Sequence, residues 1–293
     1  MTPALRLQGR WFCAIASAGA IVSLIGFRLT PIQEIVVAGA LISMLGMPHG
    51  TFDVVIARKL FGFTNITGWA LFGLMYLSLS VTVVGFWYLA PTPFLCAFLV
   101  FSALHFGGDP AKGASIFLRC LYGGAVIVLP ALLHGPELQQ LLGLVAGPAS
   151  AAVVAPVLSK VAGPWLFAIA AAFFLQAGGS RPTTWELTAL AAVSLLAPPL
   201  VGFTIYFCTM HSPRHILRTL ANLPDVDRRN SVALVLWSNL FVLAALALIG
   251  WLTIDVAIAS WLMQLIFVSL AALTLPHMML LEGARRWGVP ARN

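Results

Sequence analysis

Histidine is the residue type in this chain whose placement most suggests chemistry. Five of the six histidines lie within or at the end of long apolar stretches: His49, His105, His211, His215 and His277. Ionisable side chains are costly among residues that cross a membrane, so they indicate a functional site there. We therefore expect these imidazoles to converge on a metal. The sixth, His134, closes an apolar run and is expected to form a hydrogen bond between helices instead.

The spacing of these residues adds further potential ligands. His49 and Asp53, His105 and Asp109, and His211 and His215 are each four residues apart. Residues four apart share one face of a helix, with Cβ atoms about 5–6 Å apart, so each pair can reach a common ion. Each aspartate has an alternative role, as a hydrogen-bond partner that orients an imidazole. Arg214 is expected to pair with one of these carboxylates or to mark the cytoplasmic interface.

The type of ligand indicates which metals fit. Imidazole and carboxylate, without thiolate or thioether, suit iron, manganese, zinc or copper, and a site with open positions suits iron that handles dioxygen. The seven candidate ligands are His49, His105, His211, His215, His277, Asp53 and Asp109. They exceed what one octahedral ion needs, so the residues leave open one or two iron ions.

The elements that must position these residues are membrane helices. Only 9% of the 293 residues are charged and 60% are hydrophobic, with a mean hydropathy of +0.98. Soluble domains carry about 25% charged residues. The composition predicts an all-α, polytopic bundle of about eight to ten transmembrane helices, forming a single membrane domain over residues 1–293. The +7 net charge comes from basic residues in short loops and at the termini, so it does not indicate nucleic-acid binding. The expected location is the cell inner membrane.

Two stretches are expected to depart from simple crossings. Residues 185–215 are too long for one upright crossing and contain Pro198-Pro199, which predicts a hairpin of two short helices or a strong kink. Residues 135–162, with their prolines, glycines and polar side chains, are expected to form an interfacial or re-entrant connection. The histidines lie near the carboxyl ends of their apolar runs, so a shared site requires those ends to face one side of the membrane.

Aromatic residues near the histidines are candidates for an apolar substrate channel. The strongest are Tyr206, Phe203, Phe207 and Trp237, with Trp87, Tyr88, Trp261 and Phe267 also considered. Tyr206 is the most interesting, because it lies five residues before His211. Packing between helices or placement in an interfacial belt is the alternative for each of them.

Four motifs, in order along the chain, resemble those of the Brp/Blh family of carotenoid dioxygenases. They are Pro48-His49-Gly50 with Asp53, His105-Phe106-Gly107 with Asp109, His211-Ser212-Pro213-Arg214-His215, and Pro276-His277-Met278. The resemblance covers residues 40 to 282. It implies an iron-dependent membrane enzyme that cleaves β-carotene with O₂ at the 15,15′ double bond to give two all-trans-retinal, often supplied to a microbial rhodopsin. By that likeness His49, His105, His211 and His215 are the catalytic iron ligands, and His277 is a ligand or orients one.

Three other functions fit histidines within membrane helices. A di-iron lipid desaturase or hydroxylase is typically richer in histidine boxes, whereas this chain has no adjacent histidines. A haem-binding protein would use histidine pairs on facing helices. A transporter that relays protons or moves a metal is a third alternative, although no inverted repeat is visible.

Overall fold

The computed structural model describes residues 2–63, 65–110, 113–174, 181–221, 225–253 and 257–286. Within these ranges the chain is helical and contains no strand, as the long apolar runs predicted. The elements are α1 Pro3–Leu24, α2 Pro31–Leu41, η1 Ile42–Gly46, α3 Pro48–Thr51, α4 Asp53–Phe61, α5 Ile66–Leu89, α6 Pro91–Phe106, α7 Ile116–Val128, α8 Pro130–Leu133, α9 Gly135–Ala146, α10 Pro148–Phe174, α11 Arg181–Leu196, α12 Pro199–Tyr206, η2 Phe207–His211, α13 Ser212–Ala221, α14 Asp225–Leu252 and α15 Ile258–Arg286. The labels η1 and η2 denote π-helical turns.

Helices long and apolar enough to cross a membrane dominate the described part of the chain. Seven such stretches occur: Pro3–Leu24, Pro31–Phe61, Ile66–Leu89, Ile116–Leu133, Pro148–Phe174, Val232–Leu252 and Ile258–Gly283. Helix α6 is apolar but shorter, with 16 residues. In a bilayer every backbone polar group must be satisfied internally, which a helix achieves within its own segment. The prediction of a polytopic helical membrane protein is confirmed.

Prolines set the helix boundaries that the sequence left open. Helix α11 ends at Leu196 and α12 begins at Pro199, so residues 185–215 do not form one kinked helix; α12 is followed by η2 and the start of α13. The expected interfacial connection over 135–162 is wrong in its second half. Pro136 and Pro148 occupy first-turn positions of α9 and α10, where their missing N–H costs nothing, and Gly147 between them takes φ of 87°. Helix α10 then continues through Pro156 as a candidate span.

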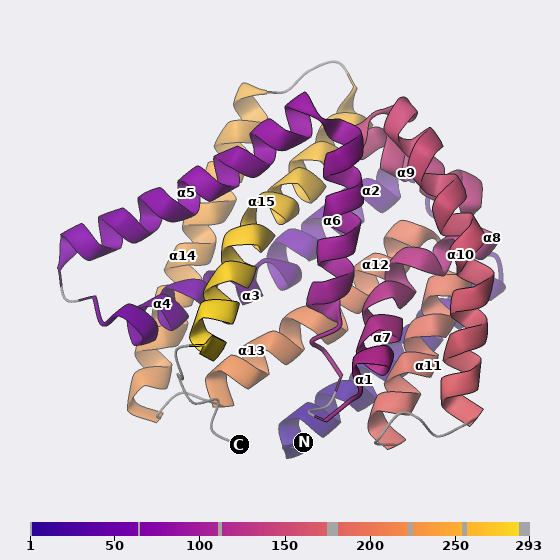
Figure 1. Cartoon of the computed structure of the whole chain (residues 1–293), viewed down its shortest axis with the longest axis horizontal. Helices are drawn as coiled ribbons and strands as arrows, with labels where there is room; N and C mark the ends of the chain where they lie inside the picture. Colours follow the sequence, from indigo (N-terminus) through magenta and orange to yellow (C-terminus); the bar gives the residue numbers. More distant parts are fainter. Residues whose placement is uncertain are drawn as a thin grey trace.

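The helices that carry the five histidines occupy the middle of the molecule. Figure 1 shows α9 and α10 at one edge, α4, α5 and α14 at the other, and α3, α6, α12, α13 and α15 between them. Helix α15 packs against α2, α4, α5 and α9, while α3 contacts α13, α14 and α15. This packing brings segments from the start, middle and end of the chain to one interior region.

A close contact between α6 and α7 fixes the turn that follows His105. A Cβ atom at Gly123 would lie 1.9 Å from the Ala103 carbonyl oxygen and 2.6 Å from the Gly107 nitrogen, so only glycine fits there. Arg119 Nε on α7 donates to the Gly107 carbonyl over 2.8 Å. Because α7 is held against the end of α6, the turn that carries Asp109 has a fixed position.

Candidate metal centre

Five histidine side chains from separate helical segments meet in the interior. His49 lies on α3, His105 on α6, His211 at the end of η2, His215 on α13 and His277 on α15. The ring centroid of His49 is 4.9 Å from that of His211, 5.6 Å from those of His215 and His277, and 6.4 Å from that of His105. The structure thus brings together all five histidines that the sequence singled out. We call them the histidine cluster.

The ring nitrogens of three members of the histidine cluster are close enough to share an ion. One nitrogen from each of His49, His105 and His277 lies within 4.8 Å of the other two. His211 adds a ring 4.6 Å from that of His105, and His215 one 5.0 Å from that of His277. Metal–nitrogen bonds are about 2.0–2.1 Å long, so this spacing approaches that of ligands around one ion.

Hydrogen bonds orient three of the imidazoles through Nδ1. His277 Nδ1 lies 2.6 Å from Asp53 Oδ1, and His211 Nδ1 lies 3.0 Å from Asp109 Oδ2. His49 Nδ1 lies 2.5 Å from the Gly46 carbonyl oxygen. Ionised carboxylates and carbonyls only accept hydrogen bonds, so Nδ1 donates in each case and Nε2 keeps a free lone pair. This arrangement is typical of metal-ligating histidines.

Unpartnered nitrogen atoms show that the cluster fits a metal. The Nε2 atoms of His211 and His277 and the Nδ1 atom of His215 are buried and have no hydrogen-bond partner. A buried polar atom left without a partner costs about 1–3 kcal/mol. A metal ion would satisfy several such atoms at once, and the all-imidazole set suits a first-row transition metal.

The two aspartates lie differently from what helical spacing predicted. Each aspartate was expected beside the histidine four residues before it, Asp53 beside His49 and Asp109 beside His105. Instead Asp53 contacts His277 and Asp109 contacts His211, across different helices. The reason is that neither pair lies within one continuous helix: Phe52 separates α3 from α4, and α6 ends at Phe106. Each carboxylate therefore contacts the Nδ1 atom of an imidazole from another helix.

Two tyrosines complete the hydrogen bonds of these carboxylates. Tyr206 donates its hydroxyl to Asp109 Oδ2 over 2.5 Å, and Tyr76 donates to Asp53 Oδ2 over 3.0 Å. Tyr206 is fully buried. Its hydroxyl is directed to Asp109 and it does not line the apolar cavity described below, so its substrate role stays a prediction. Tyr76 was missed by the sequence reasoning, because nothing in the apolar run around it distinguishes it.

A pair of π-helical turns positions His49 and His211. The turn η1 ends at Gly46, whose carbonyl oxygen accepts the hydrogen bond from His49 Nδ1. The turn η2 ends at His211 itself. The two turns pack together, and Ser212, which directly follows η2, donates its hydroxyl to the Leu45 carbonyl in η1 over 2.7 Å. A Cβ at Gly46 would lie 2.4 Å from the Phe207 ring. Single π-helical turns are frequent at functional sites, because the extra residue re-aims the side chains that follow.

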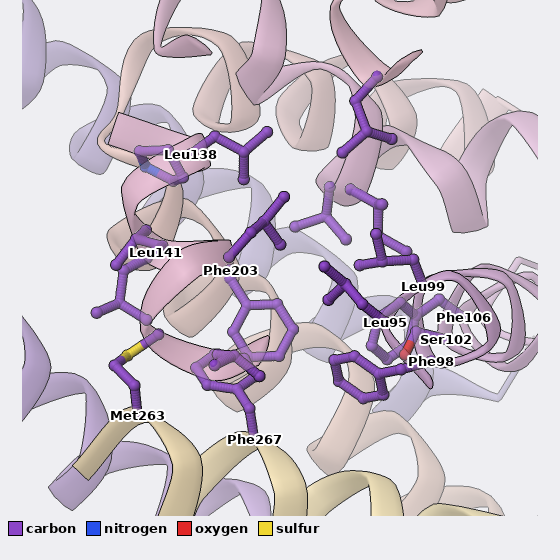
Figure 2. A pocket seen from close by; sticks show the side chains of 17 residues that line it. Leu95, Phe98, Leu99, Ser102, Phe106, Leu138, Leu141, Phe203, Met263 and Phe267 are labelled. Atoms are coloured by element: carbon purple, nitrogen blue, oxygen red, sulfur yellow. The ribbon is translucent and has the colours of Figure 1, made fainter. Parts of the chain in front are cut away.

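An apolar cavity lies beside the histidine cluster. Its volume is about 90 Å³. Its wall comes from α6, α7, α9, α10, α12 and α15, and Ser102 is its only hydroxyl-bearing side chain. Figure 2 shows Leu95, Leu99 and Phe98 on one side, Leu141 and Met263 on the other, and Phe203 with Phe267 between them.

Aromatic rings separate this cavity from the histidines. Phe106 lines the cavity, and its ring centroid lies 4.9 Å from that of His211. Phe203 also lines it and stacks on Phe207 at 5.4 Å; Phe207 in turn stacks on His211 at 5.4 Å. The cavity therefore lies one ring from His211 through Phe106, and two rings from it through Phe203 and Phe207.

The remaining predicted substrate residues lie elsewhere. Phe207 does not line the cavity and stands between Phe203 and His211. Trp237 is 71% exposed on α14 and does not line this cavity, so its substrate role stays a prediction without support from the cavity. An exposed tryptophan on an apolar span fits contact with lipid. His134 stays apart from the cluster, 3.2 Å from Glu137 on the next turn.

The sequence reasoning also missed a buried ion pair next to the cluster. Arg214 was expected to pair with one of the two aspartates or to mark the cytoplasmic interface, but its guanidinium is buried and pairs with Glu186 on α11 at 2.7 and 2.8 Å. Glu186 was overlooked although it is an acidic residue within a long apolar run, which is the signal that could have found it.

Fold and site together define a class of protein: a polytopic helical membrane protein with a buried, histidine-rich centre beside an apolar cavity. The comparison with known families agrees with this class. The sequence model of the beta-carotene 15,15′-dioxygenase family matches residues 40–283, and the chain belongs to that family.

Two curated relatives carry the same activity in their names. The beta-carotene 15,15′-dioxygenase of uncultured marine bacterium 66A03 is 28% identical over 266 residues, covering 83% of this chain and 91% of the relative. The probable beta-carotene 15,15′-dioxygenase Blh of Halobacterium salinarum is 28% identical over 235 residues, covering 70% of this chain and 67% of the relative. No solved structure matches the chain.

Removing the charge behind one imidazole tests the geometry of the cluster. We expect Asp53→Asn to weaken metal binding about 10- to 100-fold, because the partner that orients His277 loses its charge. Metal titration of the purified, metal-free protein in detergent measures this. Glu137→Gln is the matched control, since Glu137 faces His134 away from the cluster. Equal losses in both variants would contradict a specific role for Asp53.

Proposed function

We propose that this chain cleaves β-carotene with O₂ at the central 15,15′ double bond and releases two molecules of all-trans-retinal. The observation that carries the proposal is the junction of the apolar cavity with the histidine cluster at Phe106 and Phe203. A hydrocarbon without polar groups can be recognised only by shape and apolar contact, and the lining of this cavity offers little else. Family membership supports the same reaction.

We propose iron as the metal, held by His49, His105, His211, His215 and His277, with one ion or two. Asp53 and Asp109 would orient His277 and His211 rather than bind the ion, which fits their hydrogen bonds to Nδ1. When bound, iron supplies the activation of dioxygen. The reaction breaks the C=C bond and places one oxygen atom on each carbon, so O₂ balances it without a reductant.

The protein's own residues have three roles in this proposal. The cavity wall excludes water and holds the polyene, so the bond that is cleaved is the one that reaches the cluster. Phe106 and Phe207 cover His211 with aromatic carbon, so the Phe106 ring must turn aside for the polyene to reach the metal. The hydrogen bonds through Nδ1 fix the imidazoles before substrate arrives.

The proposed setting follows from the apolar helices and the product. We place the chain as one membrane domain in the lipid bilayer of the cell inner membrane, where β-carotene dissolves. Retinal released there is available to a retinal-binding protein of the same membrane, such as a microbial rhodopsin. The family membership gives no support to the alternatives of a lipid desaturase, a haem protein or a transporter.

Expression in a carotene-producing bacterial host tests the activity. We expect the cells to lose their orange colour and to accumulate all-trans-retinal, two molecules for each β-carotene consumed. With ¹⁸O₂ as the gas, both retinal molecules should carry the label. Carotene that persists in iron-supplied membranes containing the folded protein would overturn the proposal, and cleavage at another double bond would correct it.

A further inference from the structure

A buried ion pair adjoins the histidine cluster without belonging to it. Arg214 is completely buried and Glu186 is 2% exposed. The two parallel contacts join Arg214 Nη1 to Glu186 Oε2 at 2.8 Å and Nη2 to Oε1 at 2.7 Å. Arg214 lies on α13 between His211 and His215, so the pair links α11 to the segment that supplies two of the five imidazoles.

Helix α1 packs against this ion pair through Gln8 and Gly9. Arg214 Nε donates to Gln8 Oε1 over 2.9 Å, and Gln8 Nε2 donates to the Thr209 carbonyl in η2 over 2.8 Å. A Cβ atom at Gly9 would lie 2.1 Å from Glu186 Oε1, so the α1 backbone approaches the carboxylate as closely as glycine permits. Gln8 and Gly9 precede residue 40, where the family match begins.

The arginine also reaches the turn that carries Asp109. Arg214 Nη1 donates to the Asp109 carbonyl over 3.1 Å. Arg218, one helical turn further along α13, donates to the carbonyls of Gly108, Asp109 and Pro110 over 2.7, 2.8 and 3.0 Å. These carbonyls lie beyond the end of α6, where no following helical turn can satisfy them. The two guanidinium groups thus hold the backbone of the turn, and the Asp109 side chain faces His211.

We propose that Arg214, held by Glu186 and Gln8, is a positioning residue for the metal centre, acting through Asp109 on His211. This role rests on the proposed metal site. Five donors in a rigid fork allow one guanidinium to contact Glu186, Gln8 and the Asp109 carbonyl together. The competing role is that the pair merely joins α1, α11 and α13. In that case an apolar pair of similar volume would serve as well, because buried ion pairs contribute little net stability.

Cobalt titration of the metal-free protein separates the two roles. The double variant Arg214→Met with Glu186→Leu removes both charges, so neither is left unpaired. We expect it to bind Co²⁺ about 10- to 100-fold more weakly than the wild type, the usual range for a residue that orients a ligand, with a shifted visible d–d spectrum. Arg214→Lys keeps a positive charge for Glu186 but cannot make all the contacts, so we expect the same spectral shift with a smaller loss of affinity.

Thr92→Val is the matched control, because it breaks the 2.8 Å contact between Thr92 on α6 and Ser150 on α10 without touching the turn at Asp109. It should keep wild-type affinity and spectrum. A folded double variant with the wild-type affinity and spectrum would overturn the positioning role. If the double variant does not fold, an unchanged spectrum in Arg214→Lys overturns it equally. A wild-type protein that binds no Co²⁺ would instead overturn the metal site itself.

Discussion

Replacing His277 by alanine should abolish both metal retention and retinal formation. His277 contributes an unpartnered, buried Nε2, and its Nδ1 is oriented by Asp53 over 2.6 Å. Its removal therefore takes away an ion contact and leaves a buried carboxylate facing an empty space. We expect the iron content of purified protein to fall below about a tenth of the wild-type value and retinal formation to fall at least about 100-fold, beyond the usual effect of an orienting residue.

Metal analysis by mass spectrometry and retinal assay by chromatography measure the two effects on one preparation. His134→Ala is the matched control, because His134 is also a buried histidine beside a carboxylate but lies outside the histidine cluster. It should keep full iron content and activity. If His277→Ala retained wild-type iron while eluting normally in detergent, the last helix would have no part in the centre.

The sequence predicted the helices and the convergence of histidines for the same physical reason. Long apolar runs must be helical in lipid, and an imidazole such as His277 within such a run needs an interior partner. What the sequence could not give was the pairing between helices. Asp53 and His277 are 224 residues apart, and Asp109 and His211 are 102 apart. Local spacing predicted instead that each aspartate would lie beside the histidine four residues before it. The helices end at Thr51 and Phe106, between the two members of each pair, so that prediction fails.

The cavity was less predictable than the centre. Phe203 and Phe267 were both considered from the sequence and line it, but Trp237 and Tyr206 were considered on the same grounds and do not. Aromatic residues serve equally in packing, interfacial contact and ligand binding, so their identity alone does not select among these roles. Only the arrangement of α6, α12 and α15 decides which rings face the empty volume.

Filling the cavity should stop substrate cleavage while leaving the metal in place. Ser102 lies on α6 one helical turn before Phe106, lines the cavity and is 8% exposed. Ser102→Trp would put a large ring where the proposed polyene lies, three residues from His105. We expect kcat/KM for β-carotene to fall at least about 100-fold, equivalent to about 2.7 kcal/mol, with iron content unchanged.

The size dependence makes this test specific to the cavity. Ser102→Ala keeps the volume open, and we expect it to retain activity within a few fold of wild type, with Ser102→Val between alanine and tryptophan. Leu74→Trp is the matched control, because Leu74 on α5 is 65% exposed and faces away from the protein interior. Inserting extra atoms into packed structure costs about 1–3 kcal/mol, so thermal midpoints must accompany the kinetics. If Ser102→Trp were folded, loaded with iron and fully active, the polyene would have to reach the histidines by another route.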